Sequence, residues 1–165
     1  MSPITIDSIK TWIKNTEQHH WKEMGEASDS QSLDWTCPKD IFKLDDFFIE
    51  SIFKLGQEFF YKNELHLALS VLTVLVFLNP ISPHAQLLLG LTFINLGRKE
   101  EAEQALGTAL FLAPSDLSII YYVGRYYFSN GDKATAVKFF EIILDSKDAT
   151  PDMKHQCRKL INRGL

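Results

Sequence analysis

One fixed interval recurs along this chain and limits what it can fold into. Gly56, Gly90 and Gly124 are equally spaced, and alanine, aromatic, aliphatic and proline positions keep the same spacing. Agreement of several residue classes at one interval indicates tandem copies of a structural unit that buries its apolar face against its neighbours. The other positions in the series are Ala68, Ala102 and Ala136, Phe59, Phe93 and Tyr127, Leu55, Leu89 and Val123, and Pro80 and Pro114.

Each unit is predicted to be two helices joined by a short turn. The first helix carries the aliphatic–glycine pair, and the small glycine lets a neighbouring helix approach closely. Gly97 and Gly131 follow this helix, where glycine suits a left-handed backbone, and Asn63 stands at the matching place in the first unit. The second helix presents the repeated alanine at the tightest helix–helix contact. It ends at a proline, Pro80 or Pro114, or at a polar run.

These units resemble the tetratricopeptide repeat, a helix–turn–helix of about 34 residues. The resemblance covers about 49–150 and implies an all-α fold of three tandem repeats, 49–82, 83–116 and 117–150, stacked in a right-handed superhelix. Three departures from the pattern leave this inference unchanged: Asn63 in the first turn, Leu75 and Ile143 in place of the small residue seen at Ala109, and the missing final proline.

Helices are expected on both sides of the repeats. Residues 1–48 are predicted to hold a helical segment reaching Met24, a polar loop over 25–38 and a short helix over 40–48. Residues 151–165 are predicted to form a capping helix, with Thr150 as its N-cap and a proline in its first turn.

Charge and composition exclude several classes of function. The formal net charge is −4, so the chain lacks the basic surplus expected of a nucleic-acid-binding protein. Its longest apolar stretch, Leu65–Leu78, is too short to cross a bilayer, and the start has no signal-peptide pattern. Two distant cysteines, Cys37 and Cys157, favour a reducing compartment. We therefore expect a cytoplasmic protein without stable membrane insertion.

Motifs of catalysis and cofactor binding are missing from the sequence. It contains no glycine-rich phosphate loop, no GxSxG and no HExxH. His19 and His20 lie near two glutamates, but adjacent helical residues point about 100° apart, which disfavours a shared metal. We expect no enzyme, no metal site and no cofactor.

The resemblance implies that the first helices of the repeats line an inner groove. By analogy with the family, the register also places Glu50, His84, Ser118 and Ser129 there, and more than half of all the groove positions are large apolar or aromatic residues. Such a groove is predicted to bury apolar side chains of a bound protein segment, although the N-terminal segment or a second copy is an alternative cover. The predicted peptide-binding residues are Phe53, Gln57, Phe60, Tyr61, Leu87, Leu91, Ile94, Asn95, Tyr121, Arg125 and Phe128.

The outer face of the first repeat is unusually apolar. Its second helix places Leu67, Val71, Val74 and Phe77 on that face. Such a face needs a cover, and we expect either residues 1–24 or another subunit, in a homodimer, to provide it.

The whole layout resembles the class II chaperones of bacterial type III secretion, which hold translocator proteins before export. The resemblance rests on size, element order, acidic charge and the apolar groove. It implies a chaperone that sequesters an apolar segment of a secreted protein, with Gln57, Asn95 and Arg125 fixing the segment's register. Two alternatives stay open: a chaperone of the needle subunit of the same system, and a general assembly scaffold.

Overall fold

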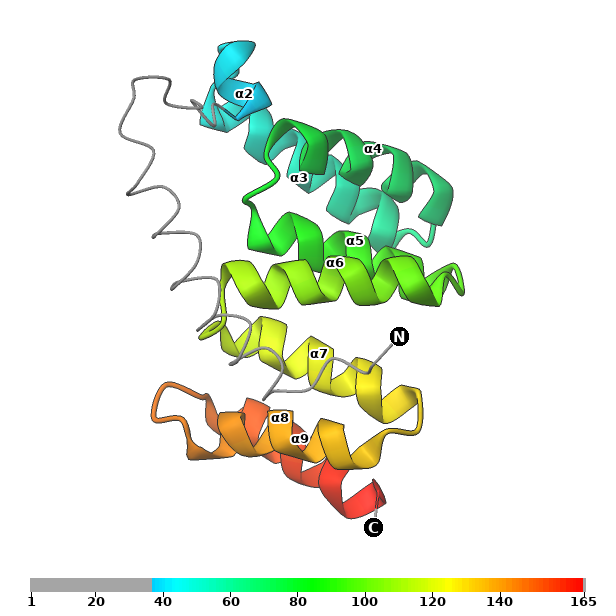
Figure 1. Ribbon diagram of the computed structural model, residues 1–165, viewed down its shortest axis with the longest axis vertical. Coiled ribbons are helices and arrows are strands. Elements are labelled where there is room, and N and C mark those ends of the chain that lie inside the picture. Colours follow the sequence, from blue (N-terminus) through cyan, green and yellow to red (C-terminus); the bar gives the residue numbers. More distant parts are fainter. Residues whose placement is uncertain (1–36, 165) are drawn as a thin grey trace, which may run out of the picture. The chain divides into compact units, whose positions relative to one another are not determined.

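The computed structural model describes residues 37–164, which fold entirely into helices and connecting turns (Figure 1). The all-α prediction is confirmed for this part of the chain. The expected helix up to Met24 and most of the loop after it lie outside the described residues. The helices are α2 (Pro38–Ile41), α3 (Asp46–Tyr61), α4 (Leu65–Leu78), α5 (Pro83–Asn95), α6 (Lys99–Leu112), α7 (Leu117–Ser129), α8 (Lys133–Asp145) and α9 (Pro151–Gly164).

Three antiparallel helix pairs, α3 with α4, α5 with α6 and α7 with α8, stack one on the next, and α9 packs against α8 (Figure 1). The recurring small residues explain how closely the helices of a pair approach. The repeated alanines are fully buried, and each repeated glycine lies against the equivalent residue of its own partner helix. These contacts are Gly56 with Leu72, Gly90 with Leu106 and Gly124 with Phe140.

The turns inside the pairs have the left-handed backbone that the sequence predicts. The φ angles are 74° at Gly97 and 87° at Gly131. Asn63, at the matching place in the first repeat, adopts 60°, a conformation that asparagine tolerates better than most residues. The substitution of glycine by asparagine therefore preserves the turn.

The entry to the first repeat differs from the sequence prediction. A short helix was expected over 40–48, but α2 ends at Ile41 and the backbone turns left-handed at Lys43, with φ of 54°. Asp45 then starts a new helix, because its carboxylate accepts a hydrogen bond from the backbone N–H of Phe48 at 2.7 Å. α3 consequently begins at Asp46, before the first expected groove residue.

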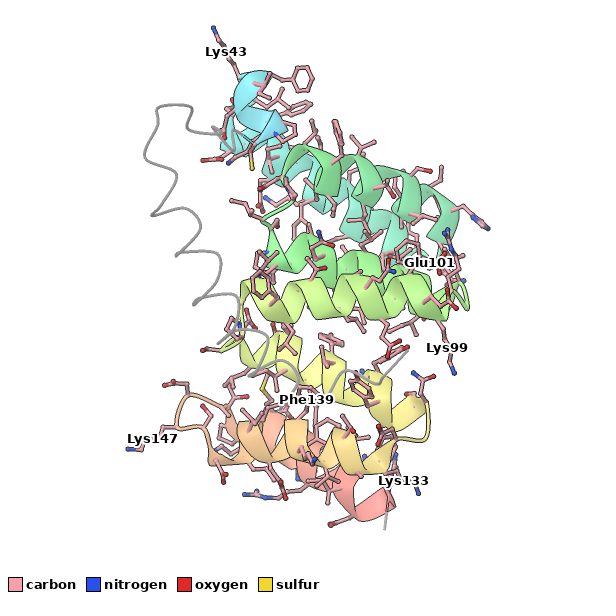
Figure 2. All side chains as sticks on the ribbon, in the orientation of Figure 1. Lys43, Lys99, Glu101, Lys133, Phe139 and Lys147 are labelled. Carbon is pink, nitrogen blue, oxygen red and sulfur yellow. The ribbon has the colours of Figure 1, made fainter. Side chains whose placement is uncertain are left out.

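The other end follows the prediction at Thr150, whose hydroxyl accepts a hydrogen bond from the backbone N–H of Met153 at 3.2 Å and caps α9. α9 places Cys157 fully in the interior, where burial raises the pKa of the thiol. Between α7 and α8, the ring of Phe139, which is labelled in Figure 2, stacks on Tyr127 with ring centroids 5.8 Å apart. Within 37–164, no helix has the length and apolar character needed to cross a membrane.

Candidate peptide-binding groove

A pocket of about 490 Å³ opens between the C-terminal halves of α3, α5 and α7, the first helices of three successive pairs. Its volume falls within the range of sites that hold small ligands or a few side chains. The turn after α5 and the start of α6 complete its rim. The lining residues are Phe60, Tyr61, Leu88, Leu91, Ile94, Asn95, Gly97, Lys99, Tyr122, Arg125, Tyr126, Ser129 and Asn130.

The pocket is built from equivalent positions of successive repeats. Tyr61, Asn95 and Ser129 follow one another at the repeat interval, and all three line it. Leu91 and Arg125 form another such pair. The stacking of equivalent units therefore generates the pocket, while the side chain at each position sets its local chemistry.

The two sides of the pocket differ in polarity. From α3 and α5 come Phe60, Leu91 and Ile94, all half-buried, so part of each apolar surface remains available for contact. From α7 and the turn after it come the polar side chains of Arg125, Ser129 and Asn130, all exposed. A bound molecule would meet mainly apolar surface, together with the exposed Asn95, from α3 and α5. From α7 it would meet hydrogen-bonding groups beside the rings of Tyr122 and Tyr126.

Local contacts hold the polar side in place. The side-chain amide of Asn130 donates a hydrogen bond to the backbone carbonyl of Tyr126 at 3.0 Å. The guanidinium carbon of Arg125 lies 5.8 Å from the ring centroid of Tyr121 and 6.0 Å from that of Tyr122. Burial raises the pKa of Tyr126, so its phenol is protonated at neutral pH. The phenol donates a long hydrogen bond of 3.5 Å to the backbone carbonyl of Lys99.

The pocket brings together six of the eleven predicted peptide-binding residues: Phe60, Tyr61, Leu91, Ile94, Asn95 and Arg125. The other five lie elsewhere. Leu87 is 6% exposed, and Gln57 and Phe128 are half-buried without lining the pocket. The phenol of Tyr121 hydrogen-bonds to the side chain of Gln156 in α9.

Phe53 lines a second, separate hollow of about 320 Å³ near the start of α5. Glu50 and His84, which the family register also placed in the groove, lie in this hollow. Nε2 of His84 lies 3.4 Å from a carboxylate oxygen of Asp116. Burial alone would raise the pKa of Asp116, but hydrogen bonds from Ser118 and Ile119, with a contribution from His84, hold it below its ordinary value of 3.8.

The register used for the sequence prediction missed several lining residues. Leu88 and Tyr122 occupy equivalent positions of successive repeats, one residue beyond Leu87 and Tyr121, which were chosen instead. A signal was present in the sequence, because Tyr122, Tyr126 and Ser129 are spaced four and three residues apart and therefore share one face of a helix with Arg125.

The predicted apolar outer face is exposed over most of its extent. Leu67, Val74 and Phe77 are 50%, 53% and 64% exposed, respectively. Val71 instead turns inward, and its Cγ1 lies 3.6 Å from the position that a Cβ on Gly56 would take. Whether residues 1–24 cover this face lies outside the described part of the chain.

A family model described as tetratricopeptide repeat matches residues 53–116 and 92–153. Together these ranges span more than half of the 165 residues. The chain belongs to the tetratricopeptide-repeat family. The interpretation of the recurring interval is therefore confirmed, and the pocket lies on first helices of this tetratricopeptide-repeat protein.

Solved structures share this arrangement of helices. SycD of Yersinia enterocolitica, a type III secretion translocator chaperone, matches with a TM-score of 0.70 and 11% identity over 78% of this chain and 98% of SycD. PcrH, solved in complex with the chaperone-binding region of PopD, gives 0.64 and 15% over 73% and 93%. A chain of the CopN–Scc3 complex gives 0.66 and 18% over 87% and 84%. At these identities the likeness is one of fold.

Proposed function

We propose that this tetratricopeptide-repeat protein is a chaperone that holds an apolar segment of a secreted type III translocator in its inner groove before export. The observation that carries the proposal is the open pocket across three successive first helices, with half-buried apolar side chains on one side and exposed polar groups on the other. Binding of this kind needs neither a covalent step nor a cofactor.

A concave pocket of this kind is a better binding site for an extended segment than a flat protein surface would be. Phe60, Leu91 and Ile94 each offer apolar surface that is still partly in contact with water. Covering that surface with partner side chains is favourable by roughly 25 cal/mol for each Å² removed from water. Asn95 and Arg125 supply groups for hydrogen bonds to the partner's backbone or side chains, which would set its register.

The class of partner that we propose comes from the similarity of this fold to those of known chaperones. SycD is a translocator chaperone, and PcrH was solved with a bound region of PopD. These chaperones share the helical stack of this protein, so a secreted translocator is the partner we infer for it. The mildly acidic charge of the chain and the half-buried apolar residues of the pocket are in keeping with this role.

The groove can be tested with the variant Phe60→Ala combined with Leu91→Ala. Truncating two anchor residues commonly costs on the order of 2 kcal/mol each, which together would weaken binding by roughly a thousandfold. A matched control is Leu55→Ala with Ile142→Ala, since both residues are exposed and neither lines either of the two hollows described above.

The measurement starts from the full-length protein and the partner that co-purifies with it, identified by mass spectrometry. Calorimetric titration of each variant with that partner gives the affinity, and thermal melts show that the variants are folded. A groove variant that is folded and binds as tightly as the control would place the ligand elsewhere and remove the mechanism. A co-purifying needle subunit in place of a translocator would favour the alternative chaperone class.

A further inference from the structure

The pocket in the groove is positively charged although the chain as a whole is acidic. Its lining includes Arg125 and Lys99 but neither aspartate nor glutamate, whereas the formal net charge of the chain is −4. A local surplus of positive charge therefore stands beside the apolar side of the pocket.

These two cations are unpaired within the described residues. Other basic side chains nearby are neutralised: Lys62 pairs with Glu58, and Arg98 pairs with Glu101 at 2.7 Å. The guanidinium of Arg125 instead lies over the rings of Tyr121 and Tyr122, which hold it without satisfying its hydrogen-bond donors. Lys99 is the first residue of α6, and its side chain extends away from the helix (Figure 2).

Repeat symmetry places the cation in a defined relation to the apolar contacts. Leu91 of α5 and Arg125 of α7 occupy equivalent positions of successive repeats. The position that holds an apolar side chain in the second repeat therefore holds a guanidinium in the third. Arginine can bind a carboxylate through two parallel N–H···O hydrogen bonds. These charge-assisted bonds are stronger than the hydrogen bonds that arginine makes to a neutral acceptor.

We propose that the segment bound in this groove carries an acidic side chain beside its apolar anchor, with the anchor against Phe60 and Leu91 and the carboxylate on Arg125, supported by Lys99. This inference rests on the proposed function and narrows its partner. Directly packed helices lie about 10 Å apart, which is a lower bound for α5 and α7, and an extended chain rises about 3.3 Å per residue. The two partner residues are therefore separated by roughly three positions or more.

The test uses a library of random peptides displayed within a loop of a carrier protein, so that no peptide offers a free terminal carboxylate. The full-length protein is the bait in three forms: wild type, Lys99→Gln with Arg125→Gln, and Arg158→Gln with Lys159→Gln. The third form removes the same amount of charge from exposed positions of α9, outside the pocket, and serves as the matched control.

We expect selections on the wild type and the control to enrich peptides with an apolar residue and, roughly three or more positions away, aspartate or glutamate. On the Lys99→Gln, Arg125→Gln protein the apolar preference should persist and the acidic preference should disappear. In fluorescence titrations, changing the selected glutamate to glutamine should weaken binding to the wild type about fivefold at low salt, and added salt should shrink the difference.

The outcomes separate this inference from the function on which it rests. Apolar peptides without an acidic preference would overturn the acidic partner and leave the groove chaperone standing. Acidic peptides that bind the Lys99→Gln, Arg125→Gln protein as tightly as the control would overturn the role of these two cations. Selections without any apolar preference would overturn both proposals.

Discussion

Gly124 of α7 lies against the ring of Phe140 of α8, so closely that a Cβ on Gly124 would come within 2.7 Å of Cε1 of Phe140. The same Cβ would lie 3.1 Å from Cβ of Phe139, an atom that moves only with the backbone. In the first repeat the matching contact is between Gly56 and Cδ2 of Leu72, the end of a flexible side chain. All three repeats have this contact, but they differ in how well they can accommodate a larger side chain at the glycine.

Gly124→Ala is expected to destabilise the protein by about 1–2 kcal/mol. Overpacking a well-filled interior costs about 1–3 kcal/mol, and the better helix propensity of alanine returns up to about 1 kcal/mol. Gly56→Ala serves as the control and should cost less, because rotation of Leu72 can relieve its clash. Urea unfolding curves give both values, and equal destabilisation by the two substitutions would contradict this account of the packing.

The left-handed turn at Asn63 gives a second prediction. A residue with a Cβ and no side-chain amide pays roughly 1 kcal/mol for this backbone conformation, whereas glycine adopts it without that penalty. We therefore expect Asn63→Ala to lower the melting temperature and Asn63→Gly to leave it unchanged or raise it. Thermal melts of the two variants check this, and indistinguishable melts would mean that the turn is not strained at this position.

The repeat interval predicted most of the fold because it reports contacts that recur in every unit. Gly97, Gly131 and the buried alanines act through local geometry and packing within one pair, and these are visible in a single sequence. The break before Asp45 was missed because a local cap there outweighs the helical pattern of the surrounding residues.

The residues that line the pocket were predicted only in part, because tertiary contacts determine the rest. Leu91 and Arg125 line the pocket as expected, but Tyr121 is engaged by Gln156 in α9. The family register treats every repeat alike and cannot show that the last one packs against a terminal helix. Leu88 lines the pocket in place of its neighbour Leu87, although the two side chains are almost equally buried, at 7% and 6% exposed.

Asp132 gives a prediction about acid stability. Its carboxylate accepts a hydrogen bond from the backbone N–H of Thr135 at 3.0 Å and caps α8. Hydrogen bonds from the backbone and side chain of Thr135 hold the pKa of Asp132 below its ordinary value of 3.8. The stabilisation is therefore complete above the unfolded-state pKa of 3.8 and is lost as the pH falls through the lower folded-state pKa.

Asp132→Asn should keep most of the cap, since asparagine caps helices well, and should remove this titration. We expect the variant to lose less stability than the wild type between pH 5 and pH 3, and to be close to it at pH 7. Asp132→Ala should lose about 1 kcal/mol at pH 7. Denaturant unfolding across this pH range is the measurement, and parallel pH profiles of the wild type and Asp132→Asn would refute the assignment.

The outer face of α4 gives a prediction about self-association. Val74 and Phe77 are more than half exposed, so charging them should cost little folding stability. If a second copy covers this face, Val74→Lys with Phe77→Lys should shift the protein from dimer to monomer. Light scattering coupled to size-exclusion chromatography measures this. A wild-type protein that is monomeric at high concentration would exclude the dimer.

Tyr121 ties the last repeat to the terminal helix, and this connection can be broken by removing one atom. Its phenol donates a hydrogen bond of 2.7 Å to Oε1 of Gln156, whose side-chain amide donates in turn to Asp152 at 2.8 Å. Burial raises the pKa of Tyr121, so the donor proton is present at neutral pH.

Tyr121→Phe removes that hydroxyl and leaves the ring contact with Phe140, so it should cost about 0.5–1 kcal/mol. The loss should be local: amide hydrogen exchange in α9 should accelerate while exchange in α5 stays unchanged. Tyr61→Phe is the control, since this residue is 78% exposed and its phenol has no hydrogen-bond partner among the described residues. Unchanged exchange in α9 of Tyr121→Phe would show that apolar packing around Cys157 alone holds this helix.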